Sequence, residues 1–200
     1  MQDWWSYTIS DFLLFSPRTY YRMIERYNES VWPAQLLTTA LGVAILAALR
    51  SPSPRQGRII ATVLAVLWMW VAWAFLLQRY ATINWAIKFV VPLFVLEALL
   101  LMWWGGIRGE LSFEAGPHAR ARLGAALFVA AVLVYPTLAV IMDRPWRQAE
   151  VFGAAPDPTA IGTVGLLLMT NTRVRWGLLP VPLLWCGIAG ATLWAMSAQS

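Results

Sequence analysis

Charged residues are scarce in this sequence. Only 12% of its 200 residues are charged and 60% are hydrophobic, whereas a soluble domain usually carries about 25% charged residues. So little charge cannot cover a water-soluble globule of this size, and the mean hydropathy of +0.60 points the same way. The shortage excludes an ordinary soluble domain. It predicts an all-α integral membrane protein, since helices satisfy their own backbone hydrogen bonds in lipid.

Residue types that carry chemistry are equally rare. The sequence has one cysteine, Cys186, and one histidine, His118, so neither a disulfide nor a histidine metal-ligand pair is available. It contains no Gly-rich phosphate motif, metalloprotease motif or nucleophile elbow. We expect no metal and no cofactor, and an integral membrane enzyme is the least favoured function. Nucleic acid is not an expected partner either, because the net charge of +5 comes with no basic stripe or RNA-binding module.

The sequence does contain several long runs of apolar residues. A spanning helix needs about 17 to 25 mostly apolar residues. The runs predict a bundle over residues 31–200 with about six transmembrane segments: 31–49, 59–77, 86–104, 123–142, 151–170 and 178–196. Pro92 lies in the third segment and Pro136 near the end of the fourth, and both are expected to be structural.

The segment 151–170 is irregular because Pro156 and Pro158 interrupt it. We expect Asp157 to be the N-cap and Pro158 the first helical residue of a short helix. Extended chain would lead into this helix. Such backbone is tolerated at membrane depth only where other helices shield it.

Residues 1–30 form a separate N-terminal segment. After Ser16-Pro17, four apolar residues follow the spacing of one helix face, namely Tyr20, Met23, Ile24 and Tyr27. Charged residues occupy the rest of the helix. The pattern predicts an amphipathic helix in the membrane interface. We favour a surface anchor, and the alternatives are a lid over a pore or an arm that docks a partner.

Arginines in the loops indicate the orientation. With six spans, the loops 50–58, 108–122 and 173–175 fall on one side and carry more Arg near the span ends than the opposite loops do. Cytoplasmic loops are enriched in Lys and Arg. This rule places both termini in the periplasm.

Polar residues near the opposite, outer side predict a vestibule. The candidate binding or proton-site residues are Glu97, Arg79, Asn84, Lys88, Asp143 and Asp157. Glu97 differs from the others because it lies near the middle of the third span. A carboxylate at that depth is costly and usually faces the bundle interior. We expect it to be protonated or paired, with Tyr135, Thr192 or backbone near Pro92 or Pro136 as possible neighbours, and its role to be a proton or cation site or a structural hydrogen bond.

Several stretches carry a resemblance to a known family. They are Ser10–Tyr21 (SDFLLFSPRTYY), Val31–Gln35 (VWPAQ), Gln78–Ala86 (QRYATINWA) and Val151–Thr159 (VFGAAPDPT). Together they resemble a family of small bacterial inner-membrane proteins of unknown function, some of which are labelled permeases. The resemblance covers nearly the whole chain and implies a multi-pass protein of the bacterial inner membrane.

These observations leave two main functions open. The first is a small permease or channel-like protein for an unidentified solute. The second is a non-catalytic accessory or scaffolding subunit of a larger membrane complex. The lipid bilayer is the expected environment for both, and protein partners or a homo-oligomer are compatible with both.

Overall fold

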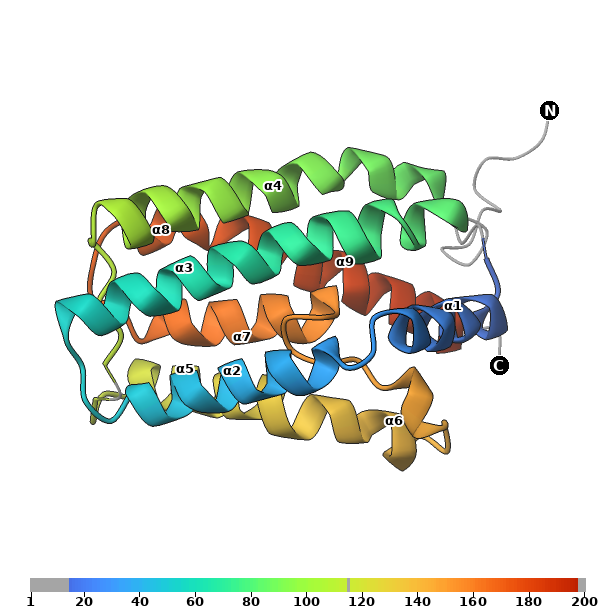
Figure 1. Ribbon diagram of the computed structural model, residues 1–200, viewed down its shortest axis with the longest axis horizontal. Helices are drawn as coiled ribbons and strands as arrows, with labels where there is room; N and C mark the ends of the chain where they lie inside the picture. The colour runs from blue at the N-terminus through green and yellow to red at the C-terminus, as the bar shows by residue number, and fades with distance from the viewer. Residues whose placement is uncertain (1–14, 115, 198–200) are drawn as a thin grey trace.

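The computed structural model describes residues 15–114 and 116–197, and within these ranges the chain is helical without strands. The main helices run along one axis and α7 lies among them (Figure 1). Among the described residues, four helices are long and apolar enough to cross a membrane: Pro54–Thr82, Trp85–Ile107, Ala119–Ile141 and Arg175–Ser197. A bent pair, Pro17–Ser30 with Ala34–Ala48, could raise the number to five.

The first half of the bundle contains α2 (Ala34–Ala48), α3 (Pro54–Trp70) and α4 (Val91–Leu100). Ser53 and Gln56 form a capping box, so α3 begins at Pro54, earlier than the apolar run alone indicates. The helix continues as the wider turns of η3 (Val71–Leu77) and then η4 (Tyr80–Thr82). The chain returns through η5 (Trp85–Phe89), α4 and η6 (Leu101–Ile107).

The second half contains α5 (Ala119–Val129), α7 (Pro156–Leu168) and α9 (Pro180–Ser197). After α5 the span continues through η7 (Ala130–Val134), η8 (Tyr135–Thr137) and α6 (Leu138–Ile141). The short helix η9 (Trp146–Gln148) precedes α7, and α8 (Arg175–Leu178) precedes α9. Pro92 lies in the first turn of α4 and Pro136 within η8, where their missing N–H groups bend or start helices.

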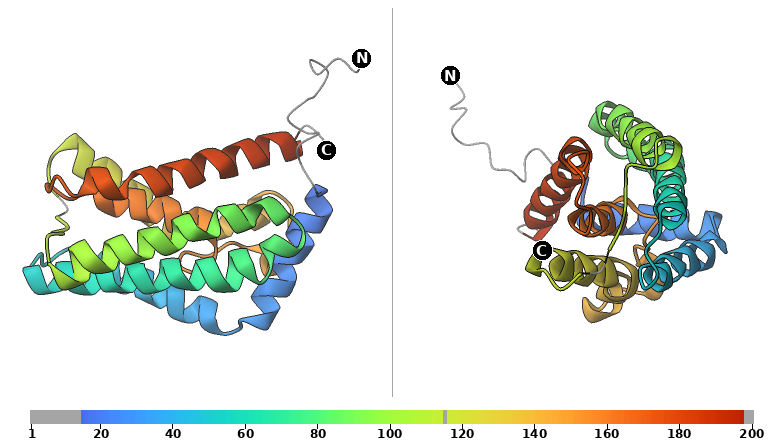
Figure 2. Two further views of the ribbon diagram at one scale, coloured as in Figure 1. Left: turned by 90° about the horizontal axis from the view of Figure 1, so that it is seen from above. Right: turned by 90° about the vertical axis from the view of Figure 1, so that its left-hand side faces the viewer.

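Helix α7 is the most enclosed element. Most of its residues are buried, and it packs mainly on α5 and α9 (Figure 2). At Gly165 an added Cβ would lie 2.6 Å from the carbonyl oxygen of Gly124 on α5. Close backbone approach through glycine is a common way for helices to associate in membranes. At 13 residues, α7 is about 20 Å long, which is less than the roughly 30 Å hydrocarbon thickness of a bilayer.

The prediction for the start of α7 is partly wrong. The helix begins at Pro156 with Ala155 as its N-cap, so Asp157 lies inside the first turn and does not cap it. The helix is short, as predicted, but it is not entered by extended chain: Ala155 has extended backbone angles, whereas Ala154 N and Ala155 N both donate to the Val151 carbonyl and close a turn. Asp157 is therefore free to direct its side chain toward neighbouring helices.

Helix α1 (Pro17–Ser30) lies across the end of the bundle, turned by 88° from α2. Figure 2 shows it at the same end as the last turns of α9. Its predicted apolar face, Tyr20, Met23, Ile24 and Tyr27, is buried. Tyr27 packs on Phe75 with ring centroids 5.0 Å apart, so this face covers the bundle rather than lipid.

Candidate functional site

The segment before α7 enters the interior of the bundle. Its residues Val151 to Ala155 are all buried. Gly153 adopts a φ of +77°, and an added Cβ there would lie 2.9 Å from Leu67, midway along the span Pro54–Thr82. Only glycine combines this backbone angle with such close contact. The start of α7 is thus held deep inside the protein.

Polar backbone groups in this segment find partners within the protein. Thr159 Oγ1 accepts a hydrogen bond of 2.8 Å from Gly153 N and donates one of 2.6 Å to the Ala155 carbonyl. Tyr27 Oη donates to the Ala154 carbonyl at 2.8 Å. These bonds satisfy irregular backbone at a depth where water is scarce.

Asp157 lies at the meeting point of three elements. Its side chain is buried and accepts hydrogen bonds from Trp185 Nε1 on α9, at 2.8 Å, and from Tyr135 Oη on η8, at 3.0 Å. The helix N-terminus adds a favourable partial positive charge. Asp157 thus accepts two side-chain hydrogen bonds and does not act as the predicted N-cap.

Glu150 is a second buried carboxyl beside Asp157. It accepts a hydrogen bond of 3.3 Å from Tyr20 Oη, which α1 brings from the far end of the sequence. Burial raises the pKa of Glu150 to about 8, and the charge of Asp157 adds to the rise, while Arg144 and the Tyr20 hydrogen bond oppose it. At neutral pH this carboxyl therefore holds its proton most of the time, and it releases the proton within a unit or so above neutrality.

A groove of about 270 Å³ leads to Glu150. Its polar lining is Tyr21, Tyr135, Arg144, Glu150 and Ser197, and its other walls are apolar. The guanidinium of Arg144 lies 4.0 Å from the centre of the Tyr21 ring. Within residues 15–114 and 116–197, Arg144 Nε and Nη1 find no hydrogen-bond partner although both are covered from solvent. The groove therefore combines an available cation with a titratable acid.

The other candidate residues are dispersed. Asn84 caps η5 by accepting a hydrogen bond of 3.1 Å from Ala86 N. Lys88 and Asp143 are exposed, and Asp143 has a left-handed φ of 54°. Arg79 lines a shallow hollow with Arg22 and Arg26. In the part of the chain that the structure describes, no ion pair joins any of these residues to another candidate.

Glu97 is buried without a polar contact. It has no exposed surface, and neither carboxyl oxygen has a hydrogen-bond partner among the described residues. The expected neighbours are engaged elsewhere, since Tyr135 donates to Asp157 and Thr192 donates to the Ile188 carbonyl. One turn before it, Phe94 packs against Trp68 and Trp185 with centroid distances of 4.5 and 5.1 Å. Glu97 thus lies inside the bundle, as predicted, but apart from the Glu150–Asp157 pair.

Sequence reasoning missed Glu150 and Tyr20. Glu150 falls between the predicted segments 123–142 and 151–170, and Tyr20 belongs to the predicted apolar face of the N-terminal helix. Their contact joins residues 130 positions apart, which periodicity does not detect. The available signal was an acid immediately before the apolar stretch that begins at Val151.

No group of three or more His, Cys, Asp or Glu side chains that could hold a metal ion occurs in the described ranges.

Comparisons with known proteins give a family but no function. Searches of curated proteins and of solved structures find no match. A family model does match residues 18–199, and the chain belongs to that family, DUF6064, a family of unknown function.

Proposed function

We propose that the protein is a small membrane permease or channel-like protein in which Glu150 and Asp157 bind and release a proton or small cation. The observation that carries this proposal is the meeting of two buried carboxyls at the start of the short helix α7. Ionisable groups inside membrane bundles are expensive and usually mark ion or proton pathways. Discontinuous helices that end inside the bundle commonly form such sites in transporters.

Access and titration support the same function. The groove beside Arg144 reaches Glu150 from the end of the bundle that α1 covers. With a pKa of about 8, Glu150 changes protonation near physiological pH, as a proton carrier must. Its tie to Tyr20 on α1 would couple that change to movement of α1.

We further propose six membrane segments in a bacterial inner membrane, with both termini periplasmic. The four long apolar helices would be joined by α2 and by the segment 151–170, in which α7 crosses part of the bilayer and the buried turn before it leads toward the surface. Helix α1 and the last turn of α9 lie at one end (Figure 1), as an even number of crossings requires. The arginine-rich loops 50–58, 108–122 and 173–175 would then be cytoplasmic.

Proton flux into proteoliposomes tests the proposed function. A potassium gradient with valinomycin would drive uptake, and a trapped pH dye would report it. We expect flux from the unaltered protein, with Asp157→Asn and Glu150→Gln reducing it about tenfold or more. Glu25, which accepts a hydrogen bond from Gln148, lies on the outer surface of α1. The Glu25→Gln variant is the matched control and should retain flux. Flux that is absent from the well-folded protein, or unchanged in both carboxyl variants, would exclude this role.

An accessory subunit remains the second candidate, and one observation favours it. A groove of about 400 Å³ lies away from the carboxyls, at an outer corner with exposed Trp32 and Trp146. Exposed aromatic residues are enriched at protein interfaces. Purification from native membranes separates the two functions, because a permease runs alone or with copies of itself, whereas an accessory subunit retains a fixed foreign partner.

A further inference from the structure

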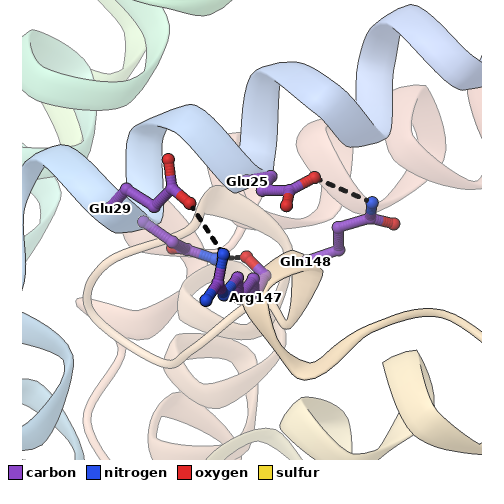
Figure 3. A network of polar contacts seen from close by, with 5 residues as sticks. Glu25, Glu29, Arg147 and Gln148 are labelled. Carbon is purple, nitrogen blue, oxygen red and sulfur yellow. Dashed lines mark hydrogen bonds and ion pairs between the residues drawn. The ribbon is translucent and has the colours of Figure 1, made fainter.

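The outer corner between α1 and α2 forms a groove of about 400 Å³ against η9. Its lining residues are Asn28, Glu29, Trp32, Gln35, Trp146 and Arg147. Figure 3 shows how Glu29 and Arg147 face each other there, beside the Glu25–Gln148 contact. This groove is separate from the one that leads to Glu150, and what it binds does not depend on the proposed permease function.

The base of the groove is held in place by hydrogen bonds. Asn28 Nδ2 donates to the carbonyls of Arg147 and Ala149, both at 2.8 Å. Gln35 Nε2 donates to the Asn28 carbonyl at 2.8 Å, which fixes the orientation of the Gln35 amide. Among the described residues Gln35 Oε1 then has no donor. A preformed polar base loses little entropy when a ligand binds.

The two charges of the groove remain available to a ligand. Arg147 Nη1 and Glu29 Oε1 are 3.4 Å apart, and both side chains are more than half exposed. Exposed pairs of this kind contribute little to stability. A ligand with its own positive and negative groups can therefore replace the pair by two stronger contacts.

The groove combines charged and aromatic side chains next to an exposed apolar surface. The charged pair comes from α1 and η9, and the exposed indoles of Trp32 and Trp146 also line the groove. Directly after the lining residue Gln35 on α2, Leu36 and Leu37 are exposed at 60% and 63%. Indoles prefer the boundary between water and hydrocarbon, so this composition suits a ligand with a charged head and an apolar tail.

We propose that this groove binds the head group of a zwitterionic phospholipid. Arg147 contacts the phosphate, Glu29 contacts the ammonium, and an acyl chain lies along Leu36 and Leu37. Phosphatidylglycerol carries the same phosphate but no ammonium, so it would leave Glu29 without a positive partner. Free phosphoethanolamine has the same charged groups but cannot use the exposed leucines, so it binds more weakly than the lipid.

Native mass spectrometry of the detergent-purified protein tests the proposal. Titration with phosphatidylethanolamine should give one tightly bound lipid, retained more strongly than phosphatidylglycerol. Arg147→Gln should weaken this binding about tenfold, the loss expected for one charge-assisted contact. Glu29→Gln should remove the preference for phosphatidylethanolamine. The matched control is Arg108→Gln, which breaks the exposed Arg108–Glu110 pair at the opposite end and should leave lipid binding unchanged.

Three results would overturn the proposal. Equal or tighter binding of phosphatidylglycerol by the unaltered protein would exclude a zwitterionic site. An equal loss in the Arg108→Gln control would indicate non-specific charge effects. Displacement of the lipid by equimolar phosphoethanolamine would identify a soluble ligand instead. Melting curves of each variant confirm that only folded protein is compared.

Discussion

Trp185 Nε1 donates a hydrogen bond of 2.8 Å to Asp157 Oδ1, which connects the last span to the first turn of α7. The same indole ring packs edge-on against Phe94 of α4 with centroids 5.1 Å apart. One side chain therefore positions three elements around the carboxyl. Tyr135 holds the second oxygen of Asp157, so the acid is fixed from two sides.

Replacing Trp185 by Phe tests this connection. The Trp185→Phe variant keeps an aromatic ring for Phe94 but removes the N–H donor. We expect the free energy of unfolding to fall by about 1 kcal/mol, within the usual range for one hydrogen bond. Trp194 is an exposed tryptophan on the same helix, so the Trp194→Phe variant is the control and should have little effect. Equal effects of the two substitutions would contradict a specific role for the Asp157 bond.

Tyr27 should be the main hydrogen-bonded anchor of α1. Its hydroxyl donates to the Ala154 carbonyl and accepts from Trp70 Nε1 at 3.2 Å. Tyr27→Phe leaves both partners unsatisfied and should cost about 1–3 kcal/mol. Hydrogen exchange in residues 149–155 should become faster. Tyr21→Phe keeps the ring that contacts Arg144 and serves as the control, with no comparable change expected.

Packing between α5 and α7 gives a third prediction. A Cβ added at Gly165 would lie 2.6 Å from the Gly124 carbonyl and 2.8 Å from Phe128 N, whereas one added at Gly190 would meet nothing within 4 Å. Gly165→Ala should therefore destabilise the protein by about 1–3 kcal/mol, as overpacking does. Gly190→Ala should be neutral or slightly stabilising, because alanine favours helix. Thermal melting in detergent measures both, and similar melting temperatures would refute the close contact.

Stability should also depend on Glu150 in a defined pH range. Its pKa rises from the ordinary 4.5 to about 8 in the folded protein, so the folded state binds this proton more tightly than the unfolded state does. The stabilisation is fully present below pH 4.5 and is lost progressively as the pH rises to about 8. Glu150→Gln should remove this loss. The melting temperature of the variant minus that of the unaltered protein should increase between these limits and then level off. A constant difference would show that Glu150 titrates normally.

The long helices were predictable because each needs a continuous apolar run. The predicted end of the second span at residue 77 coincides with the end of η3, but its start at 59 missed the capping box at Ser53 and Gln56. Charged residues in the first turn of α3 hid that start from a hydropathy criterion. The apolar face of α1 was also predictable from the helical spacing of its apolar residues. What covers that face was not, because it depends on Phe75, Ala154 and Glu150, which are distant in sequence.

The candidate site was predictable only in part for the same reason. Asp157 stood out as an acid within an apolar segment. Its donors, Tyr135 and Trp185, come from two other spans, and ordinary packing explains tyrosine and tryptophan in such spans equally well. The polar vestibule was inferred from residues near the predicted outer ends of helices. Among the described residues Asn84 accepts a local backbone hydrogen bond, and Lys88 and Asp143 are exposed.

Glu97 and Asp157 offer the sharpest contrast between two buried acids. Both carboxyl oxygens of Asp157 accept hydrogen bonds, one from Trp185 and one from Tyr135. The carboxyl of Glu97 has no hydrogen-bond partner in the described parts of the chain. A buried polar group without a partner is costly, and an apolar side chain of similar size removes that cost. Glu97→Met should therefore raise the free energy of unfolding by about 1 kcal/mol or more. Asp157→Leu should lower it by about 1–3 kcal/mol, since it leaves Trp185 Nε1 and Tyr135 Oη without an acceptor.

Chemical denaturation in detergent measures both variants under the same conditions. If Glu97→Met is as destabilising as Asp157→Leu, then the Glu97 carboxyl makes a favourable polar contact in the membrane protein, and its place is with the proton or cation pathway rather than with the apolar core.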